Sequence, residues 1–157
     1  MKFKNYIGGR WVAPSSKRYF ESRSPHDNKL LGEFPKSSKK DVKVAIKAAE
    51  KALPAWKGMP APQRGQILLK VAELLKKDKE RLARILTKEM GKVLNEARGD
   101  LQEAIDIAEY MAGEGRRLFG HTTPSELKDK FCMTIRIPLG VVGVITPWNF
   151  PIAIPAW

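Results

Sequence analysis

The chain has a single cysteine, Cys132, and no run of about 18 apolar residues. One cysteine excludes an intramolecular disulfide and is typical of a reducing compartment. The lack of a long apolar run predicts that no segment spans a membrane, and residues 1–6 lack the apolar segment of a signal peptide. We therefore expect a cytoplasmic protein that has no membrane partner.

Acidic residues are few, with 17 Asp and Glu against 29 Lys and Arg, and the net charge of +12 raises the question of a nucleic-acid partner. Basic and acidic residues alternate along 76–81, which is typical of a solvated helix face. Aromatic residues are not interleaved with the basic ones, so no base-stacking surface is predicted. We favour a solvated surface over nucleic-acid binding, and an acidic partner is a third option.

Histidine is scarce too, and no cluster of His, Cys or carboxylate residues surrounds His26. We therefore predict that His26 belongs to a turn at 25–28, and we predict no metal site. The sequence also lacks a Gly-x-Gly-x-x-Gly segment for holding a dinucleotide.

The first part of the chain is rich in short β patterns. Residues 6–12 predict a β-hairpin, because Gly8 and Gly9 accept positive φ between two β-rich arms. Residues 18–23 and 29–34 predict two further strands on either side of the turn.

The middle of the chain predicts three helices. The first begins near Ser38, which with Asp41 resembles a capping box, and is expected to end at Pro54. The second begins near Pro60, with a possible bend in its charged stretch, and is capped by Gly91; the third ends near 119–120. Apolar residues recur at helical spacing and predict buried faces, formed by Val42, Ala45, Ile46, Ala49 and Leu53, by Ile67, Leu68, Val71, Leu74, Leu75, Leu82, Ile85, Leu86 and Met90, and by Leu101, Ala104, Ile105, Ala108, Met111 and Ala112.

The last part predicts a polar loop at 122–129 and two strands. Residues 131–137 alternate apolar and polar, which indicates a strand with one dry face. Residues 141–145 are all apolar, which is typical of an interior strand of a parallel sheet. Such a strand needs neighbours, so the chain predicts an α/β fold whose sheet is incomplete.

The turn that follows, Pro-Trp-Asn-Phe-Pro at 147–151, carries the candidate catalytic residue, Asn149. An amide held between two prolines can donate a hydrogen bond to an oxyanion during attack on a carbonyl carbon. The alternative, which turn chemistry by itself favours, is that Asn149 is only a turn or helix N-cap residue.

The chain resembles the N-terminal portion of aldehyde dehydrogenases. The most specific segment is Thr-Pro-Trp-Asn-Phe-Pro at 146–151. Weaker similarity lies at residues 6–11, 24–25, 37–42, 63–64, 89–92 and 136–141. The resemblance implies an α/β fold in which 1–35 form a β-hairpin and strand arm and 36–120 form a helical layer. It also implies an oligomerisation strand at 130–140, and a first cofactor-domain strand of a Rossmann-like sheet with the start of the next helix at 141–157.

The resemblance also implies roles for individual residues. Asn149 corresponds to the oxyanion donor of an enzyme that oxidises an aldehyde to a carboxylic acid through a cysteine thiohemiacetal. Contacts to NAD or NADP are implied for Ile145, Thr146, Pro147 and Trp148. An aldehyde tunnel is implied for Phe150, Ala153 and Trp157, which fall on one helical face, with ordinary core packing as the alternative.

The family's nucleophilic cysteine, its general-base glutamate and its cofactor-binding lysine have no counterpart in these residues. Cys132 precedes the site in an alternating strand, and nothing in its local sequence favours a reactive thiolate. We therefore expect the chain by itself to be inactive and not to bind the cofactor. The alternatives are a non-catalytic module that self-associates as a homo-oligomer or docks a complementary C-terminal half, and a basic nucleic-acid binder.

Overall fold

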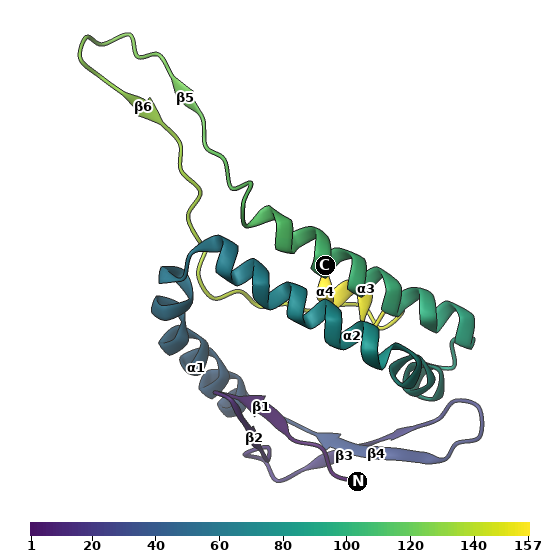
Figure 1. Cartoon of the computed structure of the whole chain (residues 1–157). Helices are drawn as coiled ribbons and strands as arrows, with labels where there is room; N and C mark the ends of the chain where they lie inside the picture. The colour runs from purple at the N-terminus through teal and green to yellow at the C-terminus, as the bar shows by residue number, and fades with distance from the viewer.

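The computed structural model describes all residues from Met1 to Trp157. The chain forms three antiparallel hairpins and three long helices; two hairpins lie together beside the start of the first helix, the third projects from the opposite side, and a short fourth helix lies near the C-terminus (Figure 1). The elements are β1 (Asn5–Ile7), β2 (Arg10–Val12), β3 (Tyr19–Arg23), β4 (Leu30–Pro35), α1 (Lys39–Gly58), α2 (Ala61–Met90), α3 (Leu94–Glu114), β5 (Thr122–Thr123), β6 (Cys132–Met133) and α4 (Ala153–Ala156).

The two N-terminal hairpins confirm the predicted strands. Gly8 and Gly9 have φ of 59° and 78°, which suits the tight turn between β1 and β2, and the Tyr6 and Trp11 rings pack with centroids 5.0 Å apart. β3 pairs with β4 around the predicted turn, where Asn28 adopts φ 56°.

Helix α1 begins as predicted but ends later. The Ser38 hydroxyl accepts a hydrogen bond from Lys40, and Asp41 accepts one from the Ser38 N–H, which forms a capping box. The prediction that the helix ends at Pro54 is wrong, because α1 continues to Gly58. Pro54 lies on an exposed face, where water can hydrate the carbonyl that the proline leaves without a donor. The predicted buried face is open as well, with Val42 55% exposed.

Helices α2 and α3 form an antiparallel pair (Figure 1). α2 starts after Pro60 and ends at Gly91, whose φ of 83° confirms the predicted cap, and it runs without a break through the charged stretch. α3 ends at Glu114, earlier than predicted, because Gly113 and Gly115 weaken the last turn. No helix of the chain is both long enough and apolar enough to cross a membrane.

The core lies between α2 and α3 and is rich in alanine, with a few leucine and isoleucine side chains. Its two clusters contain Ala83, Leu86, Ala97 and Leu101, and Ala72, Ile105 and Ala108. Ile152, just before α4, packs against the first cluster. Only 16 of 157 residues are buried, so most apolar residues of α1 and much of the predicted α2 face remain on the surface.

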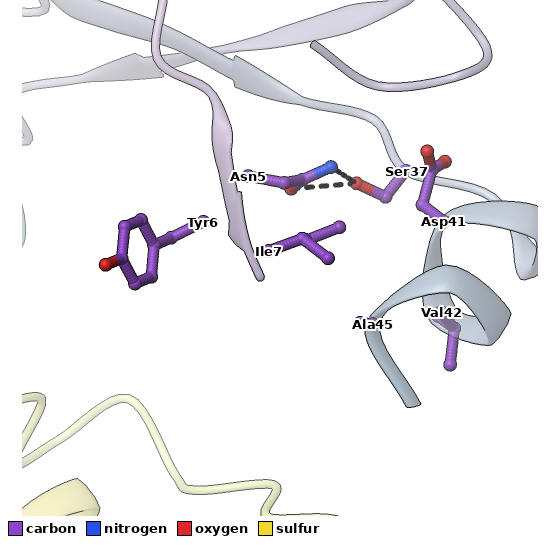
Figure 2. Close-up of a pocket in the computed structure, with 7 residues that line it drawn as sticks. All are labelled: Asn5, Tyr6, Ile7, Ser37, Asp41, Val42 and Ala45. Atoms are coloured by element: carbon purple, nitrogen blue, oxygen red, sulfur yellow. Dashed lines mark hydrogen bonds between the residues drawn. The ribbon is translucent and has the colours of Figure 1, made fainter. Parts of the chain in front are cut away.

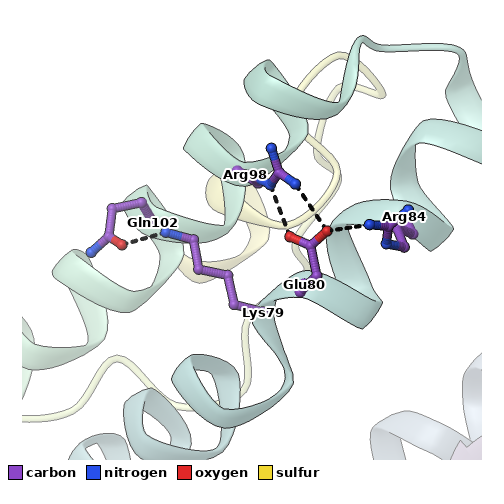
Figure 3. Close-up of polar contacts among 5 residues, drawn as sticks. All are labelled: Lys79, Glu80, Arg84, Arg98 and Gln102. Atoms are coloured by element: carbon purple, nitrogen blue, oxygen red, sulfur yellow. Dashed lines mark hydrogen bonds and ion pairs between the residues drawn. The ribbon is translucent and has the colours of Figure 1, made fainter.

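Ion pairs on the surface join the same two helices. Arg98 of α3 donates two hydrogen bonds to Glu80 of α2, at 2.8 and 2.9 Å, and Arg84 pairs with the same carboxylate at 2.8 Å (Figure 3). Lys79 donates to Gln102 at 2.6 Å. The hydrogen bond from Arg98 lowers the pKa of Glu80. Because these groups are exposed, their ion pairs and hydrogen bonds contribute little to the stability of the fold.

The β5–β6 hairpin projects away from the helices (Figure 1). The strand predicted over 131–137 has ladder pairing only at Cys132–Met133, and part of the predicted loop at 122–129 forms β5. The strand predicted at 141–145 is not formed in this structure. No neighbouring strand within residues 1–157 offers it backbone partners, so its apolar side chains stay exposed.

The close approach of α2 to α3 leads to a testable prediction. A Cβ added at Gly65 would overlap the backbone oxygen of Ala112, whereas a Cβ at Gly99, exposed on α3, would meet nothing within 4 Å. We expect Gly65→Ala to destabilise the chain by about 1–3 kcal/mol. Gly99→Ala should be neutral or stabilise it by up to about 1 kcal/mol. Urea unfolding of both variants measures the difference, and equal effects would contradict the packing.

Candidate functional site

The predicted site turn lies against the α2–α3 pair and leads into the four-residue helix α4 (Figure 1). Asn149 is exposed, and its backbone oxygen accepts a hydrogen bond of 2.7 Å from Nζ of Lys92. The Asn149 side-chain amide makes no hydrogen bond within the chain. Its N–H groups are therefore free to donate to a bound molecule.

A buried ion pair lies beneath this turn. Nζ of Lys92 is 3.2 Å from Oδ2 of Asp100, and the two side chains are 8% and 0% exposed. Oδ1 of Asp100 accepts a hydrogen bond of 2.7 Å from the backbone N–H of Ala153. The Lys92 ammonium also lies 3.9 Å from the centroid of the Phe150 ring. The pair thus contacts both ends of the segment 149–153.

The sequence did not lead us to predict this pair, although Asp100 carries a signal of it. Asp100 lies four residues before Ala104, so it falls on the apolar face predicted for α3. A carboxylate in such a stripe needs a buried partner. Lys92 belongs to the segment 89–92 that resembles the family, but its place in the connection between two helices does not indicate burial.

The residues assigned to cofactor contact lie outside any helix or strand and are mostly exposed. Ile145 is fully exposed, Trp148 is 79% exposed, and Thr146 is partly buried. Their backbone groups form no ladder, so they can offer hydrogen bonds and apolar surface to a flat ligand from one side. Contact of these residues with a dinucleotide remains a prediction. No residue of this stretch provides a phosphate-binding glycine loop.

The three residues assigned to an aldehyde tunnel lie in different surroundings. Ala153 is fully buried against α3, which is a core-packing environment. Phe150 is half-buried beneath Lys92, and Trp157 is 68% exposed beside Tyr110. Their roles in binding a substrate therefore remain predictions.

Cys132 lies in β6 on the projecting hairpin, whereas α4 lies beside α3 (Figure 1). The fold thus separates the only thiol of the chain from Asn149. His26 lies in the β3–β4 turn, as predicted, and its backbone N–H donates to the hydroxyl oxygen of Ser24. No three His, Cys, Asp or Glu side chains come together as metal ligands.

A pocket of about 220 Å³ lies between the first hairpin and the start of α1 (Figure 2). Its polar groups are already paired, since Asn5 donates to Ser37 at 2.9 Å and Asp41 accepts hydrogen bonds from the N–H groups of Ser38 and Ser15 at 2.7 and 2.8 Å. These hydrogen bonds lower the pKa of Asp41 to about 2. The pocket therefore joins the hairpin arm to α1, and its only carboxylate, that of Asp41, is already engaged in holding them together.

The lowered pKa of Asp41 predicts a pH-dependent stability. An unfolded Asp titrates near pH ~3.9, so ionised Asp41 stabilises the fold above that pH, and the contribution is lost as the pH falls toward about 2. We expect Asp41→Asn to lower the melting temperature near neutral pH and to match the parent chain near pH ~2. Thermal unfolding across this range measures the effect. Glu126→Gln, on the exposed hairpin, is the control, and a constant difference would refute the assignment.

The sequence matches the aldehyde dehydrogenase family over residues 11–157. Because this match covers most of its residues, the chain belongs to the aldehyde dehydrogenase family. It is 44% identical over 156 residues to the alpha-ketoglutaric semialdehyde dehydrogenase of Bacillus subtilis (strain 168), covering 99% of this chain and 32% of that protein. It is 40% identical over 156 residues to malonate-semialdehyde dehydrogenase 1 of Shouchella clausii (strain KSM-K16), with the same coverage.

Solved structures show the same fold. An NADP-dependent enzyme from E. coli superposes with a TM-score of 0.96 at 36% identity, over 99% of this chain and 32% of that chain. PnpE in complex with nicotinamide adenine dinucleotide superposes with a TM-score of 0.95 at 32% identity, over 100% of this chain and 32% of that chain. The chain therefore spans about a third of the length of the relatives that it matches, and it is a mixed α/β portion of this fold.

Proposed function

We propose that the chain is the N-terminal part of an NAD(P)-dependent dehydrogenase that oxidises an aldehyde to a carboxylic acid, in which Asn149 is the oxyanion donor. The observation that carries the proposal is an exposed, unpaired Asn149 amide on a turn whose backbone is held from below by Lys92. The sequence of this turn lies within the match to the family.

The names of the relatives favour one class of substrate. The two curated relatives described above are dehydrogenases of semialdehydes that also carry a carboxylate. We infer that the enzyme containing this chain acts on a semialdehyde of this class.

The remaining chemistry falls to groups outside residues 1–157. An oxyanion forms when a nucleophile attacks the aldehyde, and one amide donor aimed at it typically contributes about 3 kcal/mol of transition-state stabilisation. Cys132 lies on the projecting hairpin, so we propose that the nucleophile and the general base come from other residues. The cofactor, when bound, supplies the hydride acceptor, and residues 145–148 would contact it.

We propose that 141–145 become a strand when neighbouring strands of a Rossmann-like sheet lie beside them. The five residues are apolar, and in this structure their exposed backbone is free to pair. This proposal accounts for an apolar run that is solvent-exposed in the chain by itself.

A chimera tests the function. The chain replaces the matching segment of the Bacillus subtilis relative, and NADH or NADPH formation is followed with a semialdehyde. We expect the chimera to turn over, and Asn149→Ala to lower kcat about 100- to 1000-fold because the oxyanion loses its donor. The 157-residue chain by itself should form no product.

Asn95→Ala, on the exposed surface of α3, is the matched control and should keep the activity of the chimera. Full activity of the Asn149→Ala chimera would refute the role of Asn149. Turnover by the isolated chain would show that its own residues include a nucleophile.

We also propose that the β5–β6 hairpin mediates self-association, which would serve either an oligomeric enzyme or a non-catalytic assembly module. The side chains on its alternating face are strongly exposed. They are Phe131 (74%), Met133 (63%), Ile135 (71%) and Ile137 (71%). A projecting, two-stranded apolar surface of this kind favours burial against a second copy.

Light scattering of the purified chain measures this association. We expect a dimer or a larger species, and Ile135→Lys should shift it toward the monomer because a charge on the apolar face opposes burial. Glu126→Lys, on the same hairpin, is the control and should keep the oligomer. A monomeric parent chain would contradict the proposal.

A further inference from the structure

The side chains of Lys92 and Asp100 are almost fully buried, and each makes contacts beyond the ion pair itself. Both partners also hydrogen-bond to the site turn. Nζ of Lys92 donates to the backbone oxygen of Asn149 at 2.7 Å, and Oδ1 of Asp100 accepts a hydrogen bond of 2.7 Å from the backbone N–H of Ala153. Hydrogen bonds of this kind, with one ionised partner, are short and directional. The pair therefore connects the α2–α3 junction to two points of one short segment.

The contact of Lys92 with the backbone oxygen of Asn149 affects where the Asn149 side chain lies. The carbonyl oxygen of Asn149 lies in the peptide plane shared with Phe150, so holding this oxygen orients the backbone on one side of the Asn149 Cα. Pro147 and Pro151 restrict the backbone on both sides of the turn. The contact thus reduces the range of positions that the backbone of Asn149, and with it the base of its side chain, can adopt.

We propose that Lys92 and Asp100 are positioning residues, which hold the backbone of the turn so that the Asn149 amide is aimed at the reacting carbonyl oxygen. The inference rests on the proposed function for its catalytic consequence, but the positioning itself is a property of this chain. A displacement of a catalytic group by about 1 Å can lower a rate about 100-fold. Loss of the tether should therefore lower kcat more than it raises KM.

The choice of variants follows from the burial of the pair. Removing one partner leaves an unpaired buried charge, which by itself destabilises a fold. The double variant Lys92→Met with Asp100→Asn removes both charges, retains an acceptor for the Ala153 N–H and removes the contacts of the Lys92 ammonium with Asn149 and with the Phe150 ring. Lys92→Arg keeps a donor and serves as the rescue variant. Lys70→Met, at an exposed residue of α2, is the matched control.

The first measurement is independent of activity. In ¹H–¹⁵N spectra of the 157-residue chain, the Phe150 amide belongs to the peptide group whose oxygen Lys92 contacts, and the Ala153 amide reports the contact with Asp100. The double variant should shift the Phe150 signal strongly and retain a dispersed, folded spectrum. Lys92→Arg should shift it less, and Lys70→Met should leave it unchanged. An unmoved Phe150 signal in the double variant would overturn the inference.

The second measurement uses the chimera described above. The double variant should lower kcat about 10- to 100-fold with KM nearly unchanged, and Lys92→Arg should restore part of the rate. If Asn149→Ala lowers kcat and the double variant does not, the positioning role is wrong while the proposed function stands. If the Phe150 signal moves while Asn149→Ala keeps full activity, the proposed function fails and the structural tether stands.

Discussion

The structure depends on the close packing of α2 against α3. Alanine and glycine at the contact allow the two backbones to approach until Gly65 touches the backbone of Ala112. Dispersion contacts grow as helices approach, so this pair forms a rigid platform although the buried core is small. α1 and the N-terminal hairpins contribute no residue to this core.

The candidate site is built onto this platform by polar contacts. Ile152 packs against the Ala83–Leu101 cluster, while Asp100 holds the N–H of Ala153 from within α3. A buried carboxylate with two partners is costly to displace, because either partner would be left unpaired. The turn that carries Asn149 is thus linked to the stablest part of the chain, although its own residues form little regular structure.

Local signals in the sequence predicted much of the fold. Gly8 and Gly9, the Ser38–Asp41 box and Gly91 each act within a few residues, so the elements that they begin or end could be recognised without tertiary information. The prediction failed where the outcome depended on distant partners. Pro54 stays within α1 because that turn is solvated, and 141–145 form no strand because no other strand lies beside them.

The sequence by itself determined the family of the protein, through the segment at 146–151, together with the identity of Asn149 as the candidate donor and the positions of most helices. Only the tertiary structure showed that Lys92 and Asp100 meet beneath that turn, and that the single thiol lies on a separate hairpin. The physical reason is the distance along the sequence between the residues that interact. Caps and turns are set by neighbours in the chain, whereas the contacts of Lys92 with Asn149 and of Asp100 with Ala153 join residues 57 and 53 positions apart, which only folding brings together out of water.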